Sequence, residues 1–371
     1  MTNEFKKIFG LLKDSRIERT KKHELLDIIA IGILGTMAGA QSFEEMEDFG
    51  CHHEAWLKQY LPLTNGIPSH DTINRVFESL DPEAFQEAFL QWLQSIKTFL
   101  PETVVPIDGK TLRGSHVRSK GRKGLHVVSA WSCANGLSLG QRKVDDKTNE
   151  ITVIPELIKK LMLEGAIVTM DAIGCQKEIA TIICQQKADY VLAVKGNQGS
   201  LSEHIQDCFR LKDNTIPVYR ATDEVICEHG RLEVRHIEVM SSEILDGLVN
   251  RAEWTSLQSI MKLTYCVEAK AQTVREERFY ISSLPPQDPD KLLRAIRSHW
   301  SIESMHWSLD VTFKEDDCRV RHETAALNLS WIRKMSLSLL KAEKSFKASI
   351  RRKQLKLWHD PDYCLNVLVK I

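Results

Sequence analysis

The chain has 371 residues, and its 50 Lys and Arg balance its 50 Asp and Glu, so the formal net charge is zero. Its length suits two or three domains, and a hydrophobic fraction of 43% with 27% charged residues excludes a disordered or low-complexity protein. The zero balance gives no overall sign of a polyanionic partner.

Two stretches nevertheless concentrate positive charge. Residues 110–123 contain no acid, and residues 333–356 contain only Glu343 against nine Lys and Arg. Such runs are typical of a surface that binds a phosphate backbone, and equally of a solvated basic face. Both interpretations stay open on the sequence alone.

Cysteine usage and hydropathy indicate the compartment. The nine cysteines include no C-x-x-C pair, which argues against zinc-ligand spacing and a disulfide framework, so we expect a reducing cytoplasm. The apolar stretch at residues 28–40 is too short to span a bilayer, and the acids before it do not suit a signal peptide. It predicts a buried helix, and we expect no membrane association.

The first 98 residues are expected to form a helical domain. Apolar residues recur at helical spacing over residues 24–38 and 42–61, and further helices are expected at residues 68–80 and 81–96. Asp81 before Pro82 is a typical helix start. This pattern is typical of a DNA-binding module and also of a plain helical bundle.

The periodicity changes at residue 103. Strands are predicted at residues 103–108, 125–133, 137–144, 165–171 and 189–196, with helices at 150–163 and 175–187. The second and third strands flank Asn135-Gly136, which is a hairpin signal. This order predicts an α/β fold with a mixed sheet flanked by helices.

Residues 215–285 break this rhythm with short alternating runs and turn signals, which predict a β-rich insertion. A long helix is expected at residues 288–313, capped by Asp288 or Asp290, and helices at 323–344 and 354–369. The expected domains are a helical domain at 1–98, a core at 99–322 and basic C-terminal helices at 323–371.

Three carboxylates stand among apolar residues. Asp108 follows the run "VVPI", and Asp171 follows the run "AIVTM". Glu303 lies on one helical stripe with Ile296, Trp300 and Trp307. It is the one charged residue of this otherwise apolar and aromatic stripe. Core packing is the favoured interpretation of the two tryptophans, although aromatic rings also stack on extruded bases.

Each carboxylate has a local explanation. Asp108 with Gly109 makes an Asp-Gly turn, Asp171 caps a helix that starts near Cys175, and Glu303 sits at the edge of its stripe. Taken together the three acids favour another interpretation, because an ionised carboxylate among apolar groups is costly unless it is paired or binds a cation. Two strand-end aspartates and one helix glutamate predict an all-oxygen site for Mg²⁺ or Mn²⁺.

Such a site has a defined chemistry. Two divalent ions about 3.5 to 4 Å apart clamp the attacking and leaving oxygens of a phosphodiester during in-line displacement. No protein nucleophile is required. The sequence has no Walker A loop, and we expect no nucleotide cofactor.

At this point the sequence resembles the DDE transposases of insertion sequences, specifically the ISAs1 group that includes the H-repeat-associated proteins. The likeness covers nearly the whole chain, from "HELLDIIAIGILGTMAGAQSFEEMEDFG" to "IRSHWSIESMHWSLDVTFKEDDCR". Between them "IDGKTLRGS", "TMDAIGCQKEIA", "YVLAVKGNQG" and "HGRLEVRHIEV" resemble the catalytic core.

The resemblance implies an RNase H-like fold in which Asp108, Asp171 and Glu303 bind two Mg²⁺ ions and catalyse DNA cleavage and joining. It also implies double-stranded DNA with terminal inverted repeats and target DNA as partners, and a homodimer in the DNA complex. The β-rich segment at 215–285 is similar to the insertion that IS4-type relatives carry before the glutamate helix.

One motif departs from the relatives. IS4-type enzymes carry Tyr, Arg, Glu and Lys around the glutamate, whereas this chain has Ile296, His299 and Asp310 at the other three positions. Arg297, His299 and His306 are the candidates to replace the missing phosphate contacts. The full set of expected DNA-binding residues is Lys110, Arg113, Lys195, Arg231, Arg297 and His299.

Two other functions remain alternatives. One is a catalytically inactive DNA-binding relic of such an element, which the presence of all three acids argues against. The other is a Mg²⁺-dependent RNase H-like endonuclease that cuts without joining. In every case we expect a cytoplasmic protein that associates with the nucleoid through DNA.

Overall fold

The structure is a computed structural model that describes residues 3–96, 103–116, 123–145, 149–212, 215–228, 231–245, 251–269 and 272–369. The chain forms two compact units. Unit 1 comprises Met1–Leu100, Gly109–Asp146 and Glu303–Ile371, and unit 2 comprises Pro101–Asp108 and Lys147–Ile302. These units cut across the boundaries expected at residues 98 and 322, because one strand and one long helix each run from one unit into the other.

The N-terminal part of unit 1 is helical, as predicted. Its helices are α1 (Asn3–Phe9), α2 (Leu25–Ala38), α3 (Phe43–His52), α4 (Glu54–Leu57), α5 (His70–Ser79) and α6 (Pro82–Ile96). The apolar α2 is buried along almost its whole length and ends at Gly39, whose φ of 104° is left-handed. Asp81 caps α6 as predicted, since its Oδ1 accepts hydrogen bonds from the backbone amides of Glu83 and Ala84.

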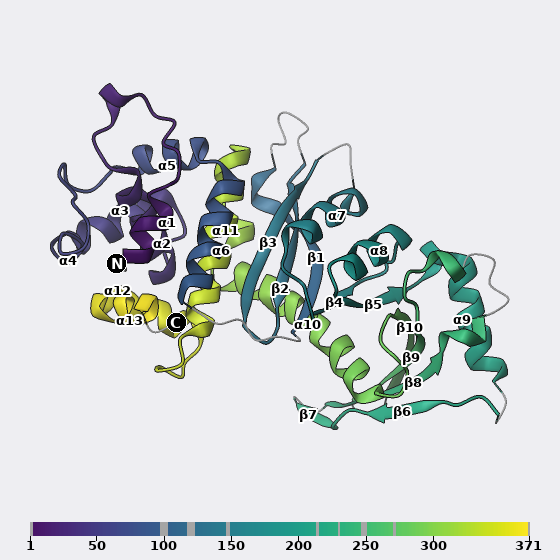
Figure 1. Cartoon of the computed structure of the whole chain (residues 1–371). Coiled ribbons are helices and arrows are strands. Elements are labelled where there is room, and N and C mark those ends of the chain that lie inside the picture. Colours follow the sequence, from purple (N-terminus) through teal and green to yellow (C-terminus); the bar gives the residue numbers. More distant parts are fainter. Residues whose placement is uncertain are drawn as a thin grey trace. The chain divides into compact units, whose positions relative to one another are not determined.

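A C-terminal helix forms the centre of unit 1. Figure 1 shows α11 (Glu323–Ala342) beside β3, and α11 also packs against α2 and α5. The helix predicted at 354–369 is instead two helices, α12 (Ile350–His359) and α13 (Pro361–Val369). Pro361 starts the second helix, where a proline is tolerated because the first turn needs no backbone donor.

The expected α/β class is confirmed by the strands. β1 (Val104–Leu112) runs parallel to β4 (Ile167–Met170), and β4 runs parallel to β5 (Asp189–Val194). The helices α7 (Glu150–Lys160) and α8 (Lys177–Gln185) precede β4 and β5. The predicted hairpin is also present, with β2 (Leu125–Ser132) antiparallel to β3 (Leu137–Val144). The strand order is β3-β2-β1-β4-β5.

The β-rich insertion is confirmed and continues the sheet of unit 2. Its strands are β6 (Tyr219–Thr222), β7 (Ile226–Glu228), β8 (Arg231–Ser241), β9 (Ser259–Ala269) and β10 (Gln272–Ser282). β10 pairs antiparallel with β5, so the insertion shares a hydrophobic core with the parallel strands. This core contains Ile167 of β4, Val191 of β5 and Tyr280 of β10. α9 (Gly199–Leu211), which the sequence patterns did not assign, precedes it.

The long helix is α10 (Pro289–Val311). Its predicted cap is Asp288, whose Oδ1 accepts a hydrogen bond of 2.9 Å from the backbone amide of Lys291. Within the described residues no single helix is long and apolar enough to cross a membrane, and α2 and α3 reach that length only as a pair bent by 95°.

A buried charge network holds unit 1 together. The Lys110 side chain, 9% exposed on β1, donates to Asp310 on α10 at 2.5 Å and to Glu315 at 2.7 Å. Glu315 belongs to the 3-10 turn η7 (Glu315–Asp317). On α11 the buried Lys334 donates to Gln141 of β3 at 2.7 Å. The network therefore joins β1, α10, η7, α11 and β3.

The pKa values of the network follow from opposing effects. Burial alone raises the pKa of Glu315, but Lys334, Lys110 and Arg333 outweigh burial and lower the pKa to about 2. Burial lowers the pKa of Lys334 to about 8 although Glu315 opposes this shift. For Lys110 the attraction of Glu315 and Asp310 outweighs burial and raises the pKa.

Lys110→Met should destabilise the protein by about 3 kcal/mol, because removing one partner of a buried ion pair leaves the other charge uncompensated. The measurement is the urea midpoint at neutral pH. The matched control is Lys187→Met, since Lys187 and Glu164 form a pair in which both side chains are 74% exposed. That pair contributes less than about 1 kcal/mol. Equal losses in the two variants would contradict a stabilising role for the network.

The network also predicts a pH dependence. Glu315 has an ordinary pKa of 4.5 when unfolded and about 2 when folded, so the unfolded state binds more protons between these values. Its stabilising contribution is complete above about pH 4.5 and declines as the pH falls through that window, by at most about 1.4 kcal/mol per pH unit. The stability difference between the wild type and Glu315→Gln should therefore narrow between pH 5 and pH 3 in urea titrations. A constant difference would contradict the assignment.

Candidate functional site

The position of Asp108 differs in one respect from the prediction. β1 continues through Asp108 and Gly109 to Leu112, so the strand does not end on the acid and the Asp-Gly turn does not form. What ends at this point is the pairing with β4, whose last partners are Ile107 and Met170. Asp108 therefore stands where β1 loses its neighbour on one side.

Asp171 is the equivalent residue on β4. It follows Met170 directly, so the two aspartates are the next residues of neighbouring parallel strands. Adjacent strands lie about 4.8 Å apart, which places the two backbones at that order of separation. The predicted helix cap is wrong, because α8 begins at Lys177 with Gln176 as its N-cap residue. Oδ1 of Asp171 instead accepts a hydrogen bond of 2.9 Å from the backbone amide of Ile173, in the turn before that helix.

The loop after Asp171 is braced from the segment that follows β5. Asn197 donates its side-chain amide to the carbonyl of Ala172 at 2.6 Å, and Gln198 donates to the carbonyl of Cys175 at 2.9 Å. Both residues come from "VKGNQG", a block that sequence reasoning valued only for Lys195. Polar residues directly after a strand were the signal that could have identified them.

Glu303 lies on α10 in unit 1, and its side chain is exposed. The apolar stripe predicted around it is only half correct. Ile296 is buried, but the Trp307 side chain is 63% exposed, so core packing is wrong for this tryptophan.

The donor chemistry of the two aspartates suits a divalent metal ion. Carboxylate oxygens are the donors that Mg²⁺ and Mn²⁺ prefer, and Mg²⁺ is often held by one or two carboxylates together with substrate phosphates. Asp108 and Asp171 meet that requirement. Across the described part of the chain, no group of three His, Cys, Asp or Glu side chains is arranged to hold a metal ion.

The expected DNA-binding residues fall into different environments. Arg113 has a side chain that is 83% exposed, and Lys195 is exposed directly after β5. Arg231 begins β8, and its side chain lies outside the described atoms. Lys110, in contrast, is occupied by the carboxylates of the buried network, which speaks against a direct role in DNA contact.

Arg297 and His299 anchor α10 within unit 2. Arg297 donates to both carboxylate oxygens of Asp223, at 2.6 and 2.8 Å. The ring Nδ1 of His299 lies 3.0 Å from the hydroxyl of Thr169, two residues before Asp171. Burial lowers the pKa of His299, and Asp171 offsets this only in part, so the ring is neutral at pH 7 and has no charge to offer a phosphate.

Sequence reasoning missed Arg235 on β8. This arginine is buried, and its guanidinium lies 4.5 Å from the ring centre of Trp300 and 4.7 Å from that of Tyr265. Arg278 on β10 approaches the same Trp300 ring at 5.9 Å. These contacts fix Trp300 of α10 to the insertion strands, which is the packing role expected for this tryptophan.

Sequence reasoning also passed over a G-x-S-x-G match at residues 136–140. Its serine, Ser138, is fully buried within β3, and its backbone amide donates to Ser338 of α11 at 3.1 Å. A nucleophilic serine of this motif requires an exposed turn between a strand and a helix. Ser138 is therefore a core residue.

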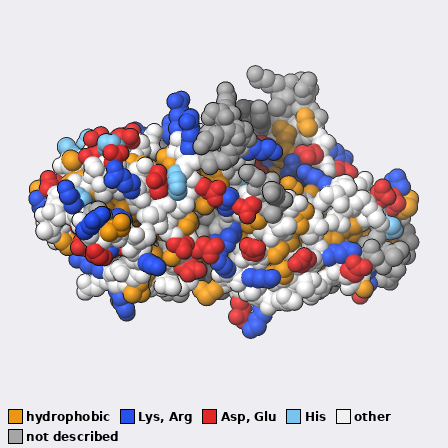
Figure 2. Space-filling view, turned by 90° about the horizontal axis from the view of Figure 1, so that it is seen from above, with side chains coloured by type: hydrophobic (Ala, Val, Ile, Leu, Met, Phe, Trp, Pro, Cys, Tyr) orange, Lys and Arg blue, Asp and Glu red, His pale blue; other side chains and the backbone are white. Residues whose placement is uncertain are grey.

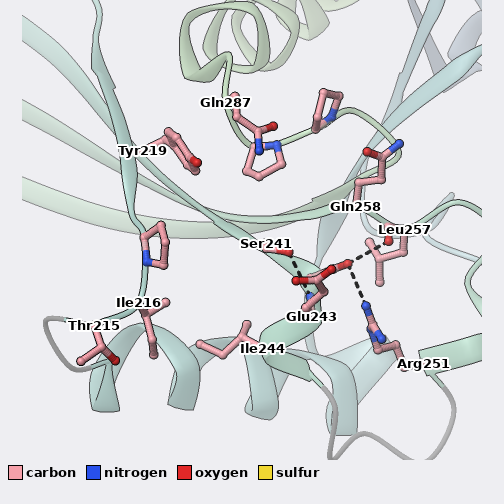
Figure 3. Close-up of a pocket in the computed structure, with 14 residues that line it drawn as sticks. Thr215, Ile216, Tyr219, Ser241, Glu243, Ile244, Arg251, Leu257, Gln258 and Gln287 are labelled. Carbon is pink, nitrogen blue, oxygen red and sulfur yellow. Dashed lines mark hydrogen bonds between the residues drawn. The ribbon is translucent and has the colours of Figure 1, made fainter.

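Two cavities of the described part of the structure are lined by residues other than Asp108 and Asp171. One, of about 590 Å³, opens at the insertion end of unit 2, where Arg251 donates to Ser242 and Ser242 donates to the carbonyl of Leu257 (Figure 3). The other, of about 520 Å³, lies in unit 1 between the start of α3, α5 and residues 314–322. None of the three predicted acids lines either cavity.

Comparison with known proteins identifies the family. A model of the family "Transposase DDE domain" matches residues 100–339, and a model of the family "DDE_Tnp_1-associated" matches residues 6–93. "Putative protein YbfL" of Escherichia coli K12 is 40% identical over 366 residues, which are 97% of this chain and 96% of the relative.

Two further relatives show the same relationship. "H repeat-associated putative transposase YhhI" of Escherichia coli K12 is 40% identical over 97% of this chain and 96% of its own length. "Putative transposase YncI" of Escherichia coli O157:H7 is 39% identical over 97% of this chain and 93% of its own length. The chain therefore belongs to the DDE transposase family.

Proposed function

We propose that this chain cleaves and joins phosphodiester bonds at the ends of an insertion sequence, with Asp108, Asp171 and Glu303 as its catalytic carboxylates. Membership of the transposase family supports the class of enzyme. The observation that carries the residue assignment is the parallel pairing that ends at Ile107 and Met170, because it makes Asp108 and Asp171 neighbours on adjacent strands.

The strand order supports the same proposal. The strand order is β3-β2-β1-β4-β5, in which β2 and β3 are antiparallel and β4 and β5 run parallel to β1. This is the order of the RNase H-like core that the sequence resemblance implies. The carboxyl ends of neighbouring parallel strands are the usual place for ligands in such sheets.

Glu303 completes the proposed set from α10. The turn that precedes it is anchored three times within unit 2, through His299 to Thr169, through Arg297 to Asp223, and through Trp300 to Arg235. The exposed carboxylate of Glu303 follows directly after this turn.

The three carboxylates would hold Mg²⁺ or Mn²⁺, with two ions per site. When bound, these ions lower the pKa of the attacking water or 3′-hydroxyl and neutralise charge on the leaving oxygen. The chain contributes orientation. The amide of Ile173 holds Oδ1 of Asp171, and Asn197 and Gln198 hold the loop behind it, so the carboxylate does not have to be ordered during the reaction.

The partners in this proposal are double-stranded DNA with terminal inverted repeats and a target DNA, bound by a homodimer in the cytoplasm. Arg113, Lys195 and Arg231 are the proposed phosphate contacts. We assign positioning roles to Lys110, Arg297 and His299, because the two cations already bind carboxylates and the imidazole is neutral.

Asp108→Asn, Asp171→Asn and Glu303→Gln should each reduce strand cleavage and joining by about a thousand-fold, because each removes charge worth several kcal/mol in the transition state. The assay contains purified protein, Mg²⁺ and a duplex that carries the DNA flanking the gene. End binding, measured in Ca²⁺ to prevent cleavage, should change little. Asp290→Asn, which removes an exposed acid from the first turn of α10, is the matched control.

The outcomes separate the alternatives. Cleavage without a joined product identifies an endonuclease, and end binding with no cleavage by the wild type identifies an inactive relic. Full activity in any one of the three acid variants refutes the assignment of that residue.

A further inference from the structure

We infer that the basic face of α12 and the loop before it bind the phosphate backbone of double-stranded DNA, independently of its sequence. This α12 surface consists of Lys344, Lys347, Arg351, Arg352 and Lys356. The inference rests on the proposed function in one respect only, namely that DNA is the polyanion which this protein meets.

The sequence around the α12 surface lacks acidic residues. Between residues 344 and 359 the sequence has no Asp or Glu. Four of its five cations are exposed, and Lys356 is half-buried. By contrast, charges of both signs are interspersed on the face shown in Figure 2. A stretch of uncompensated cations is the electrostatic footprint of a nucleic-acid contact.

Of the other four cations of the same basic run, three are buried, and Lys341 is half-buried with its ammonium 4.7 Å from the ring centre of Trp131. Lys334 belongs to the buried network, and Arg333 donates to the carbonyl of Gln41 at 3.2 Å. Lys353 is buried and donates to the carbonyl of Leu340 at 2.7 Å. Burial of these three explains why the run in the sequence is longer than the surface in the structure.

The acid of this run does not neutralise the surface. Glu343 is buried and accepts hydrogen bonds from the hydroxyl of Tyr363 at 2.7 Å and from the backbone amide of Phe346 at 3.0 Å. Its remaining attraction goes to Lys353, at 3.1 Å. The negative charge of Glu343 is therefore compensated inside unit 1 and does not neutralise the exposed cations of the α12 surface.

Aromatic rings hold two of the cations in place. The ammonium of Lys356 lies 4.7 Å from the ring centre of Phe346 and 4.3 Å from that of Tyr363, and the guanidinium of Arg352 lies 5.6 Å from the Phe346 ring. A cation held over a ring loses less side-chain entropy when it meets a phosphate. The α12 surface is partly organised before DNA arrives.

The neighbouring helix pair is the obvious competitor. α2 and α3 meet at 95° across a short turn that contains Gly39, which is the geometry of a helix-turn-helix with α3 as the reading helix. However, α3 exposes Glu44, Glu45 and Asp48. Three carboxylates on the face that should enter a groove repel the phosphates, so we assign the contact to α12 instead.

α12 packs on the same helix pair. It contacts α2, and Nη1 of Arg351 lies 3.2 Å from where a Cβ on Gly39 would be. Figure 1 shows α12 beside the N-terminal helices. The N-terminal helices thus support a DNA contact as a scaffold, while the cations come from the C-terminal part of the chain.

The test is the salt dependence of DNA binding by the full-length protein, measured in Ca²⁺ with a duplex of unrelated sequence. Neutralising Lys347, Arg351 and Arg352 together to Gln should make the negative slope of log affinity against log salt shallower by about 3, since each phosphate contact contributes roughly −0.9 to it. Lys347→Glu, which changes only the loop, should make the slope shallower by at least about 1 and covers the case in which the triple variant fails to fold.

Two controls accompany these variants. Glu44→Gln, Glu45→Gln and Asp48→Asn, combined on α3, should leave the slope unchanged or raise the affinity. Neutralising Lys159, Lys187 and Arg210, three exposed cations of unit 2, removes the same net charge elsewhere and should change the slope by less than about 0.5.

A folded α12 variant with the wild-type slope overturns the inference, as does an equal loss in the unit 2 control. The proposed function fails differently, through absence of Mg²⁺-dependent cleavage by a wild type that still binds DNA with the expected salt dependence. A wild type that does not bind duplex DNA in Ca²⁺ at low salt overturns the α12 surface directly.

Discussion

The pairing of β1 with β4 is the constraint on which the functional interpretation depends. Parallel strands in this register place Asp108 and Asp171 side by side where the pairing ends. Two carboxylates on adjacent strands, whose backbones lie about 4.8 Å apart, repel each other unless a cation or hydrogen-bond donors compensate them. The surrounding contacts all serve to keep that arrangement: donors hold Asp171, the loop after β5 braces its turn, and His299 binds Thr169. In the proposed function, this pair takes a divalent cation through its charge and its oxygen donors.

One cation close in sequence to Asp108 and one on α10 are bound by carboxylates of the scaffold. Lys110 follows Asp108 by two residues, yet its ammonium is directed to Asp310 and Glu315. A lysine from β1 thus meets an acid on α10. Arg297 is likewise taken up by Asp223. Lys110 and Arg297 therefore stabilise the scaffold, whereas the Arg113 side chain, which lies 3.5 Å from Asp316, remains 83% exposed and is one of the proposed phosphate contacts.

Much of the fold could be predicted from the sequence because its signals are local. Periodicity located the strands that carry Asp108 and Asp171, Asn135-Gly136 located the hairpin, and Asp81 and Asp288 marked helix starts. Side-chain environments could not be predicted, because they depend on partners far along the chain. Lys110 meets residues about two hundred positions away, and Trp307 continues an apolar stripe yet is exposed. Periodicity states which face a residue occupies, not whether anything covers it.

The basic run at residues 333–356 shows the same limit of sequence analysis, because only the structure tells which of its cations are exposed. In the run from 333 to 356, whether a cation is available depends on which acids fold back onto it. Lys334 is attracted by Glu315, and Lys353 forms an ion pair with Glu343. Because both lysines are buried in these interactions, neither is available at the surface. Arg351 and Arg352 face outward with no acid within nearby sequence, so their field reaches into water. A neutral chain can thus present a strongly basic helix, because buried ion pairs consume positive and negative charges together and leave the remaining charges unevenly distributed over the surface.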